Sequence, residues 1–314
     1  MDRNLALEFV RVTEAAAIAA SKWLGRGDKN SADQAAVEAM RARLNDIDFR
    51  GTVVIGEGEK DEAPMLYIGE KVGRATGKDA LEFDIAVDPL EGTSLTAAGK
   101  AGAISVIAFG PKGSLLAPPG TYMDQLSVGP VGRGLIDIQA PLEENIKKVA
   151  RASHKKPSEM TIAILERERN QHYIAVVRRL GARVVLFEHG TVAHGLAPAI
   201  SDWEIDMMIG IGGAPEAVIT AAGIKSLGGD MQAMLKPHND EFLKQAKDRG
   251  MADLNKVYEL NDLIKGSALL VATGVSPSPI LGGVTYGDDF ITTHSVMMRS
   301  QSGTIRFIKA YHKA

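Results

Sequence analysis

Strand-like and helix-like segments alternate between residues 161 and 222, and this order constrains the fold more than any other feature of the chain. Short aliphatic runs predict the strands, and apolar residues at helical spacing predict the helices. In order, the segments are strand 161–165, helix 171–180, strand 182–187, helix 192–200, strand 207–211 and helix 215–222. This succession predicts a parallel sheet covered by helices, with ligands bound in the loops beyond the carboxyl ends of the strands. Those loops are 166–169, 188–191 and 212–216.

The N-terminal part is expected to mix helices and strands. Apolar spacing predicts helices at 4–24 and 31–44, the second with Ser31 and Gln34 as a capping box and Asp33 in its first turn. Further predicted elements are strands 52–55, 81–87 and 104–109 and helix 142–152. The stretch 153–157 has the composition of a linker, so we expect two domains, 1–153 and 154–314.

Composition excludes several classes of site and partner. The net charge of -3 gives no electrostatic attraction to nucleic acid or to an anionic membrane. Because the chain has no cysteine, any metal must be bound by carboxylate, carbonyl, hydroxyl or imidazole groups. Acids near the start argue against a signal peptide, and no apolar run approaches the roughly 20 residues of a membrane span. A cytoplasmic protein without a membrane partner is therefore expected.

The strand predicted at 81–87 ends in an acidic turn, residues 88–93, that can collect oxygen ligands. Pro89 interrupts the ladder of hydrogen bonds, and Gly92 permits a tight turn. Asp88, Glu91 and the Thr93 hydroxyl can then converge at the exit of the strand, which suits Mg²⁺ or Mn²⁺ beside a phosphate. A strand-end turn with solvated acids is the competing interpretation.

Other acids also fall at predicted element ends, and each has a structural explanation of its own. They are Asp33, Glu57, Glu59, Asp61 and Glu216. Asp33 and Glu216 would complement helix dipoles, and the other three would lie in a solvated loop. Spacing alone does not show whether the fold brings these acids together.

Basic and aromatic residues near the predicted loops suit a phosphate, although a surface ion-pair run explains the arginines equally well. Arg167 and Arg169 carry fork-shaped guanidinium groups just past a strand, Lys29 precedes a helix, and Tyr122 can donate a hydrogen bond. The glycine-rich run 210–215 is a poor dinucleotide motif, because Pro215 occupies the position of its last glycine.

Several of these segments together resemble the class II fructose-1,6-bisphosphatases, which belong to the lithium-sensitive, metal-dependent sugar and inositol phosphatases. The resemblance rests on segments 25–33, 56–59, 88–93 and 211–216, and extends to 62–69, 167–169 and 293–295. These motifs occur in order from the first helix nearly to the C-terminus. Four motifs in the same order are far more specific than any one of them.

The resemblance implies a layered α-β-α-β-α sugar-phosphatase fold with the active site in the cleft between an N-terminal metal-binding domain and a C-terminal substrate-binding domain. It implies hydrolysis of the 1-phosphate of fructose 1,6-bisphosphate, a step of gluconeogenesis, with Mg²⁺ or Mn²⁺. The implied metal ligands are Asp33, Glu57, Asp88, Glu91 and Glu216. Thr93 would orient the attacking water, and Glu59 and Asp61 are weaker candidates for proton transfer. The implied substrate-binding residues are Lys29, Glu91, Gly92, Thr93, Tyr122, Arg167, Glu168, Arg169, His189, Gly190, Thr191 and Gly213. Family members commonly self-associate, so a homo-oligomer is expected.

One loop departs from the pattern of the family. Where the family usually has Asp-Gly-Asp, this chain has His189, Gly190 and Thr191, so two anionic acceptors for sugar hydroxyls are replaced by an imidazole and a hydroxyl. An unpaired polar group in a closed site costs about 1–3 kcal/mol, which would shift substrate preference by one to two orders of magnitude. The alternative is that neighbouring Glu188 or Glu168 replaces the lost acceptors, so that substrate preference is unchanged.

Three alternatives therefore stay open. The chain could hydrolyse another substrate of the same superfamily, such as sedoheptulose 1,7-bisphosphate or an inositol phosphate. It could be a non-catalytic regulator that binds a phosphosugar, although all five expected metal-binding acids are present. A dinucleotide-dependent oxidoreductase is the most remote of the three.

Overall fold

The computed structural model describes residues 5–58, 65–77, 80, 82–200 and 204–313. The chain forms two compact units, one of residues 1–115 and 265–314 and the other of residues 116–264. This division differs from the predicted boundary at residues 153 and 154, because the chain returns to the first unit for its last fifty residues. Each unit has its own sheet, which confirms a mixed α/β fold that is compatible with a layered sugar-phosphatase architecture.

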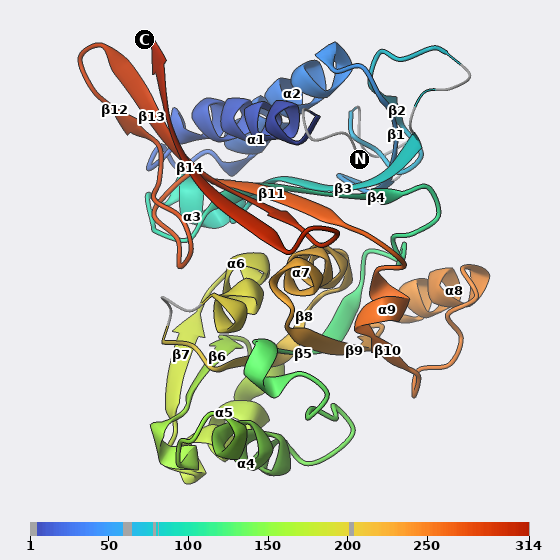
Figure 1. Cartoon of the computed structure of the whole chain (residues 1–314), viewed down its shortest axis with the longest axis vertical. Coiled ribbons are helices and arrows are strands. Elements are labelled where there is room, and N and C mark those ends of the chain that lie inside the picture. Colours follow the sequence, from blue (N-terminus) through green and yellow to red (C-terminus); the bar gives the residue numbers. More distant parts are fainter. Residues whose placement is uncertain (1–4, 59–64, 78–79, 81, 201–203, 314) are drawn as a thin grey trace. The chain divides into compact units, whose positions relative to one another are not determined.

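The first unit is built on an eight-stranded sheet in its described residues, in the order β12-β13-β11-β4-β3-β1-β2 with β14 also paired to β13 (Figure 1). Its strands are β1 (Arg50–Ile55), β2 (Lys71–Val72), β3 (Glu82–Glu91), β4 (Ile104–Pro111), β11 (Leu269–Gly274), β12 (Thr285–Tyr286), β13 (Phe290–Arg299) and β14 (Thr304–Lys313). Its helices are α1 (Leu5–Ser21), α2 (Lys29–Asp46) and the short α3 (Thr93–Ala97). Neither β12 nor any strand after it was predicted from the sequence.

An aromatic cluster holds α1 and the sheet of the first unit together. The ring of Phe9, on α1, stacks on Phe109 of β4 with centroids 3.8 Å apart, and meets Phe49 edge-on at 5.1 Å. All three side chains are fully buried. Because aromatic pairs in these geometries stabilise beyond their buried area, the cluster makes α1 a rigid layer over the strands.

The second unit has a six-stranded sheet in the order β10-β9-β5-β8-β6-β7. Its strands are β5 (Tyr122–Val128), β6 (Thr161–Leu165), β7 (Arg183–Phe187), β8 (Met207–Gly213), β9 (Asp230–Lys236) and β10 (Val257–Glu259). Its helices are α4 (Leu142–Ala152), α5 (Gln171–Arg179), α6 (Thr191–Leu196), α7 (Ala214–Leu227), α8 (Asp240–Asp248) and α9 (Leu260–Leu263), with short 3-10 turns η1 (Pro130–Gly132), η2 (Pro157–Glu159), η3 (Glu168–Asn170) and η4 (Ala197–Ala199). Figure 1 shows α4 and α5 on one face of this sheet and α6 and α7 on the other.

The segments predicted from the alternating pattern are confirmed, but the sheet they form is only partly parallel. β6 pairs in parallel with β7 and β8, whereas β5 pairs antiparallel with both β8 and β9. β5 comes from the glycine- and proline-rich stretch between Pro111 and Pro141, where the pattern is weak. It enters the sheet between β8 and β9, and this long-range pairing carries no local signal.

Among the described helices, none combines the length and the apolar character that a membrane crossing requires.

Candidate active site

A β-bulge at the end of β3 turns Asp88 and Glu91 to the same face of the first sheet. Asp88 lies opposite Val106 and Glu91 opposite Ile104, so three steps along β3 match two steps along β4. Residues three apart on a regular strand point to opposite faces, and one extra residue reverses that relation. The strand therefore does not end at Asp88, as the sequence predicts; it continues through Pro89 and presents both carboxylates together.

Glu57 leaves the neighbouring strand at the same edge of the sheet. β1 and β3 are parallel, so their carboxyl ends coincide, and Glu57 follows two residues after β1. Burial and the nearby negative charge of Asp33 raise the pKa of the Glu57 carboxyl to about 7. Burial also raises the pKa of Asp33. Two buried acids whose burial disfavours ionisation, one of them also opposed by the charge of the other, form a pair that a cation would stabilise.

The position of Asp33 differs from the predicted one. Asp28, and not Ser31, caps α2, since its side chain accepts hydrogen bonds from the Ser31 amide at 3.0 Å and the Ser31 hydroxyl at 2.6 Å. Asp33 is then the fifth residue of the helix and lies beyond the first turn, where the dipole effect is concentrated. The helix-dipole explanation for this acid is therefore weakened.

Backbone hydrogen bonds connect the loop before α2 to α3, which begins at Thr93. The amides of Gly25 and Gly27 donate to the carbonyls of Thr96 and Ala97, at 2.8 and 2.9 Å. Gly92 precedes α3 in the left-handed region with φ of 94°, so a side chain here would strain the turn. These contacts hold Lys29, the first residue of α2, in the same part of the unit as Thr93.

In the second unit, the ends of four strands collect the predicted substrate-binding residues at one edge of the sheet. β6, β7 and β8 are parallel and end at this edge, and β5 begins there because Tyr122 lies opposite Gly213. The residues placed at this edge are Tyr122, Arg167, Glu168, Arg169, His189, Gly190, Thr191, Gly213 and Glu216. The predicted substrate-binding residues of this unit therefore lie beyond the carboxyl ends of its parallel strands, even though the sheet is mixed.

Arg169 is held in position by two contacts. Its guanidinium carbon lies 4.1 Å from the centroid of the Tyr122 ring, and its Nε donates to the Ile211 carbonyl at 3.0 Å. One face of the guanidinium thus stacks on an aromatic ring, and its Nε is hydrogen-bonded to the backbone. A rigid, planar cation of this kind suits a phosphate better than a mobile ammonium group does.

Replacing Arg169 by lysine is expected to raise KM for a sugar phosphate about tenfold with a smaller change in kcat, because the charge survives but the fork and the bond to Ile211 do not. Steady-state kinetics measure this split. Arg178→Lys, at an exposed arginine of α5, is the matched control and should leave KM within twofold. An unchanged KM for Arg169→Lys would remove Arg169 from the binding site.

Arg167 bridges two loops. Its guanidinium donates to the carbonyls of Glu166 at 2.7 Å and Glu188 at 2.6 Å, and lies 3.4 Å from Nε2 of His189. It therefore connects the loop after β6 with the divergent loop after β7. Glu168, next to it, is exposed.

The divergent loop leads directly into α6. Gly190 precedes this helix with φ of 88°, and its carbonyl lies 2.7 Å from Nδ1 of His194. The His194 ring stacks on Phe187 with centroids 3.8 Å apart. Burial lowers the pKa of His194 to about 4, so the imidazole is neutral at pH 7.

His194 should make stability depend on pH. The unfolded chain binds a proton below about pH 6.5 and the folded chain only near pH 4, so the free energy of unfolding falls as the pH drops between these values. The free energy of unfolding is expected to fall by about 3 kcal/mol over the whole interval between the two pKa values. Chemical unfolding of the wild type and of His194→Gln from pH 4 to 7 measures it, since the variant lacks this contribution. Parallel pH profiles for the two proteins would contradict the assignment.

Glu216 provides a direct test of whether this site fits a cation. It is the third residue of α7, and its Oε2 is buried without a hydrogen-bond partner among the described residues. Burial raises the pKa of this carboxyl. A buried carboxylate oxygen is normally hydrogen-bonded or bound to a metal, so the donor set here suits a hard divalent cation.

The remaining acids do not complete a metal centre by themselves. Within the described residues, no three histidine, aspartate or glutamate side chains are grouped so that they could hold a metal ion. The acids at the edge of the first sheet form two pairs, Asp33 with Glu57 and Asp88 with Glu91. Glu59 and Asp61 lie outside the described residues.

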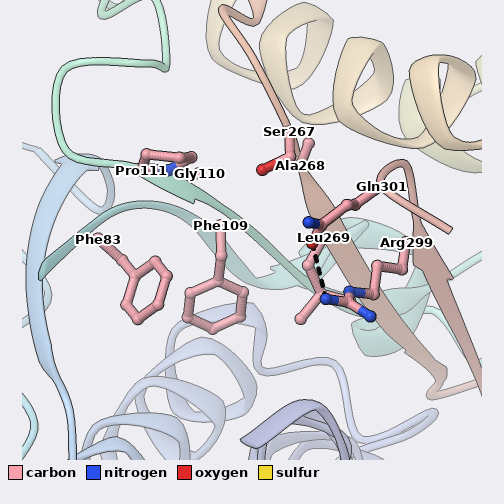
Figure 2. A pocket seen from close by; sticks show the side chains of 9 residues that line it. All are labelled: Phe83, Phe109, Gly110, Pro111, Ser267, Ala268, Leu269, Arg299 and Gln301. Atoms are coloured by element: carbon pink, nitrogen blue, oxygen red, sulfur yellow. Dashed lines mark hydrogen bonds between the residues drawn. The ribbon is translucent and has the colours of Figure 1, made fainter. Parts of the chain in front are cut away.

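Two cavities away from these edges contain no predicted site residue. One, of about 40 Å³, lies in the first unit between the rings of Phe83 and Phe109 and the segment around Ala268 (Figure 2). That volume holds no more than one or two waters. The other, of about 260 Å³, lies in the second unit beside Arg133, Lys225 and Glu259.

Two residues at the edge of the second sheet were missed by the sequence interpretation. Asn170 is fully buried, donates to the Leu165 carbonyl at 2.9 Å and accepts from the Ile211 amide at 2.8 Å, so it connects β6 to β8. His238 lies 4.7 Å from the Tyr122 ring and 3.1 Å from the Thr121 hydroxyl. The position of Asn170 directly after the arginines was a usable signal, whereas His238 follows β9 and gave none.

Known proteins are similar to this chain over nearly its whole length. A family model described as bacterial fructose-1,6-bisphosphatase, glpX-encoded, matches residues 3–312. Fructose-1,6-bisphosphatase 1 class 2 of Escherichia coli strain K12 is 46% identical over 326 aligned positions, which cover 99% of this chain and 96% of the relative. Fructose-1,6-bisphosphatase class 2 of Escherichia coli O6:H1 and that of Shigella flexneri match with the same identity and coverage.

Proposed function

We propose that this chain, which belongs to the family of bacterial, glpX-encoded fructose-1,6-bisphosphatases, hydrolyses the 1-phosphate of fructose 1,6-bisphosphate to fructose 6-phosphate and inorganic phosphate. The observation that carries the proposal is the edge of the first sheet, where Asp33 and Glu57 interact electrostatically and the bulge of β3 aligns Asp88 with Glu91. Paired carboxylates of this kind supply oxygen ligands of the type that a metal-dependent phosphatase uses. The activity is that of a phosphoric monoester hydrolase in gluconeogenesis.

The residues that would hold the metal are Asp33, Glu57, Asp88, Glu91 and Glu216. Oxygen ligands alone favour Mg²⁺ or Mn²⁺ over softer cations. When bound, such an ion neutralises phosphate charge and lowers the pKa of water. The raised pKa of Glu57 supports this assignment, as does the buried Oε2 of Glu216, which has no hydrogen-bond partner in the described part of the chain. Both carboxylates are destabilised without a positive charge.

The other proposed roles belong to side chains that bind and orient. Arg169, fixed on Tyr122, would hold the phosphate of the sugar that is not cleaved, so that binding energy positions the reacting end. Thr93, at the start of α3, would accept a hydrogen bond from the attacking water or donate one to it, and Lys29 would attract the substrate phosphate. Glu59 or Asp61 would take up the proton. Direct attack by water needs no covalent phosphoenzyme.

The test of the function is inorganic phosphate release from fructose 1,6-bisphosphate with Mn²⁺ or Mg²⁺. We expect turnover that a chelator abolishes and lithium inhibits, and saturation by each metal in turn determines the preferred ion. Absence of release with either metal would reject the bisphosphatase assignment.

A second candidate substrate is suggested by the loop of His189, Gly190 and Thr191. His189 contacts Arg167. The methyl group of Thr191 packs close to Gly212, since a Cβ added to Gly212 would lie 3.1 Å from it. This loop therefore carries an imidazole and a hydroxyl in place of the two carboxylates usual in the family. Comparing kcat/KM for fructose 1,6-bisphosphate, sedoheptulose 1,7-bisphosphate and an inositol phosphate decides between them. A preference of at least tenfold for fructose 1,6-bisphosphate excludes the second candidate.

The location and the assembly of the enzyme are also proposals, and both rest on the family. We propose a cytoplasmic enzyme that acts on a phosphorylated sugar and assembles as a homo-oligomer. Cell fractionation tests the first point and sedimentation the second.

A further inference from the structure

The strand β14 is a long, open edge of the first sheet. It spans ten residues, Thr304–Lys313, and pairs along its whole length with β13 alone in the described part of the chain. β11 and β12 pair with β13 as well, so they occupy its other side. The opposite edge of the sheet is the two-residue strand β2. An edge strand this long is a template for another strand, whereas a two-residue edge is not.

Exposed apolar side chains are concentrated beside this edge. Of the eight large hydrophobic side chains exposed in the described residues, five lie between β12 and β14. Ile305, Phe307 and Tyr311 share one face of β14, with Lys309 between the last two, and Phe290 of β13 lies on the same face opposite Lys313. Phe307 and Tyr311 are 57% and 61% exposed. We call these four residues the β14 stripe. Contiguous exposed apolar side chains of this kind mark contact surfaces.

We infer that β14 pairs antiparallel with the β14 of a second copy of this chain, and that the two stripes lie side by side on one face of the joined sheet. A two-fold axis perpendicular to the sheet keeps each face on its own side, so odd-numbered residues lie beside odd-numbered ones. Two such registers pair nine of the ten residues, one centred on Ile308 and the other on Lys309. The register centred on Ile308 places Ile305 beside the partner's Tyr311 and Phe307 beside the partner's Lys309.

The charges on β14 select this register. Arg306 and Lys309 are its cations between residues 304 and 312, and in the register centred on Ile308 neither lies directly opposite a cation of the partner. A shift to a centre at Lys309 would oppose Lys309 to the partner's Lys309, which like-charge repulsion disfavours. Lys309 already lies 5.3 Å from the Tyr311 ring in its own chain, so an aromatic neighbour suits its ammonium group.

The contact has the size of a specific interface. Two ten-residue strands in edge-to-edge pairing, with neighbouring side chains in lateral contact, bury on the order of 1,000 Å² in total, where specific association begins. The pairing also satisfies the outward backbone groups of β14. It uses none of the residues proposed for catalysis, so it is tested independently of the activity.

The first test is the mass in solution of the full chain by sedimentation equilibrium. We expect a wild-type mass of at least twice 33.4 kDa, and half of the wild-type mass for Phe307→Lys, because the new ammonium group would lie directly opposite the partner's Lys309. Val131→Lys is the matched control, since Val131 is also 57% exposed but lies in η1. A monomeric wild type, or a Phe307→Lys variant with the wild-type mass, overturns the proposal.

The second test reports the register and does not depend on a disruptive substitution. The chain has no cysteine, so Ile308→Cys introduces a single thiol that lies opposite its own copy on the two-fold axis. Directly opposed antiparallel residues have Cα atoms about 4.5–5.5 Å apart, within disulfide range. We expect oxidation to give a covalent dimer of Ile308→Cys and none of Ile305→Cys, whose thiols would lie six residues apart along the strands. Equal crosslinking of both variants, or no crosslinking of Ile308→Cys, overturns the pairing.

Discussion

Asp88→Asn is expected to lower the metal-saturated kcat for phosphate release about 10³-fold or more. The substitution keeps the shape of the side chain and removes its negative charge, so the bulge of β3 and the partner Glu91 are preserved. A loss of about 4 kcal/mol of transition-state stabilisation corresponds to this factor. The measurement is phosphate release with saturating Mn²⁺, together with a metal titration that separates weaker binding from slower chemistry.

Glu82→Gln is the control for this prediction, because it removes an acid from the other end of the same strand. Glu82 forms an exposed ion pair with Lys112 at 2.8 Å, which contributes little to stability. We expect its kcat within twofold of the wild type. An Asp88→Asn variant that keeps more than a tenth of the wild-type kcat at saturating metal would show that Asp88 is not a ligand in the reaction.

Gly213→Ala is expected to reduce kcat about 100-fold while the protein stays folded. A Cβ on residue 213 would lie 1.8 Å from Oε2 of Glu216, so the carboxylate must move from its buried position. The atom displaced is the end of a flexible side chain, which limits the cost to stability. Displacement of one proposed metal ligand by more than about 1 Å is enough to lower the rate by two orders of magnitude.

The matched control is Gly120→Ala in the same unit. An added Cβ there meets only Phe242, at 3.8 Å, which is ordinary van der Waals contact. Its kinetics should follow the wild type, and circular dichroism of both variants should match. If Gly213→Ala is as active as Gly120→Ala, then the buried position of Glu216 has no role in catalysis.

The elements of the second unit could be predicted because their signals are local. The helix at Leu142–Ala152 and the strand at Thr161–Leu165 were predicted with the bounds the structure has. Each depends on the spacing of apolar residues within about ten positions, and burial of one face is enough to select helix or strand. The common position of the loops after β6, β7 and β8 could be predicted as well, because the carboxyl ends of parallel strands lie at one edge of a sheet.

The candidate site was predicted as a set of residue types and not as a geometry. Asp88, Glu91 and Glu216 stood out because acids after strands and at helix starts are chemically suggestive. Their arrangement depends on a bulge between Asp88 and Glu91, and on the packing of α2 that brings Asp33 to Glu57. Bulges and helix packing result from contacts with distant residues, which no local pattern contains.

The sequence by itself therefore determined the mixed α/β class, the membership in a metal-dependent phosphatase family and the chemical character of the candidate site. Only the tertiary structure decided that the chain returns to its first unit through β11, where Ala272 pairs with Val106, and that β14 is left as an aromatic edge. The physical reason is range. Helix and turn preferences are set by neighbouring residues, whereas strand partners more than 150 positions apart are chosen only when the whole sheet forms.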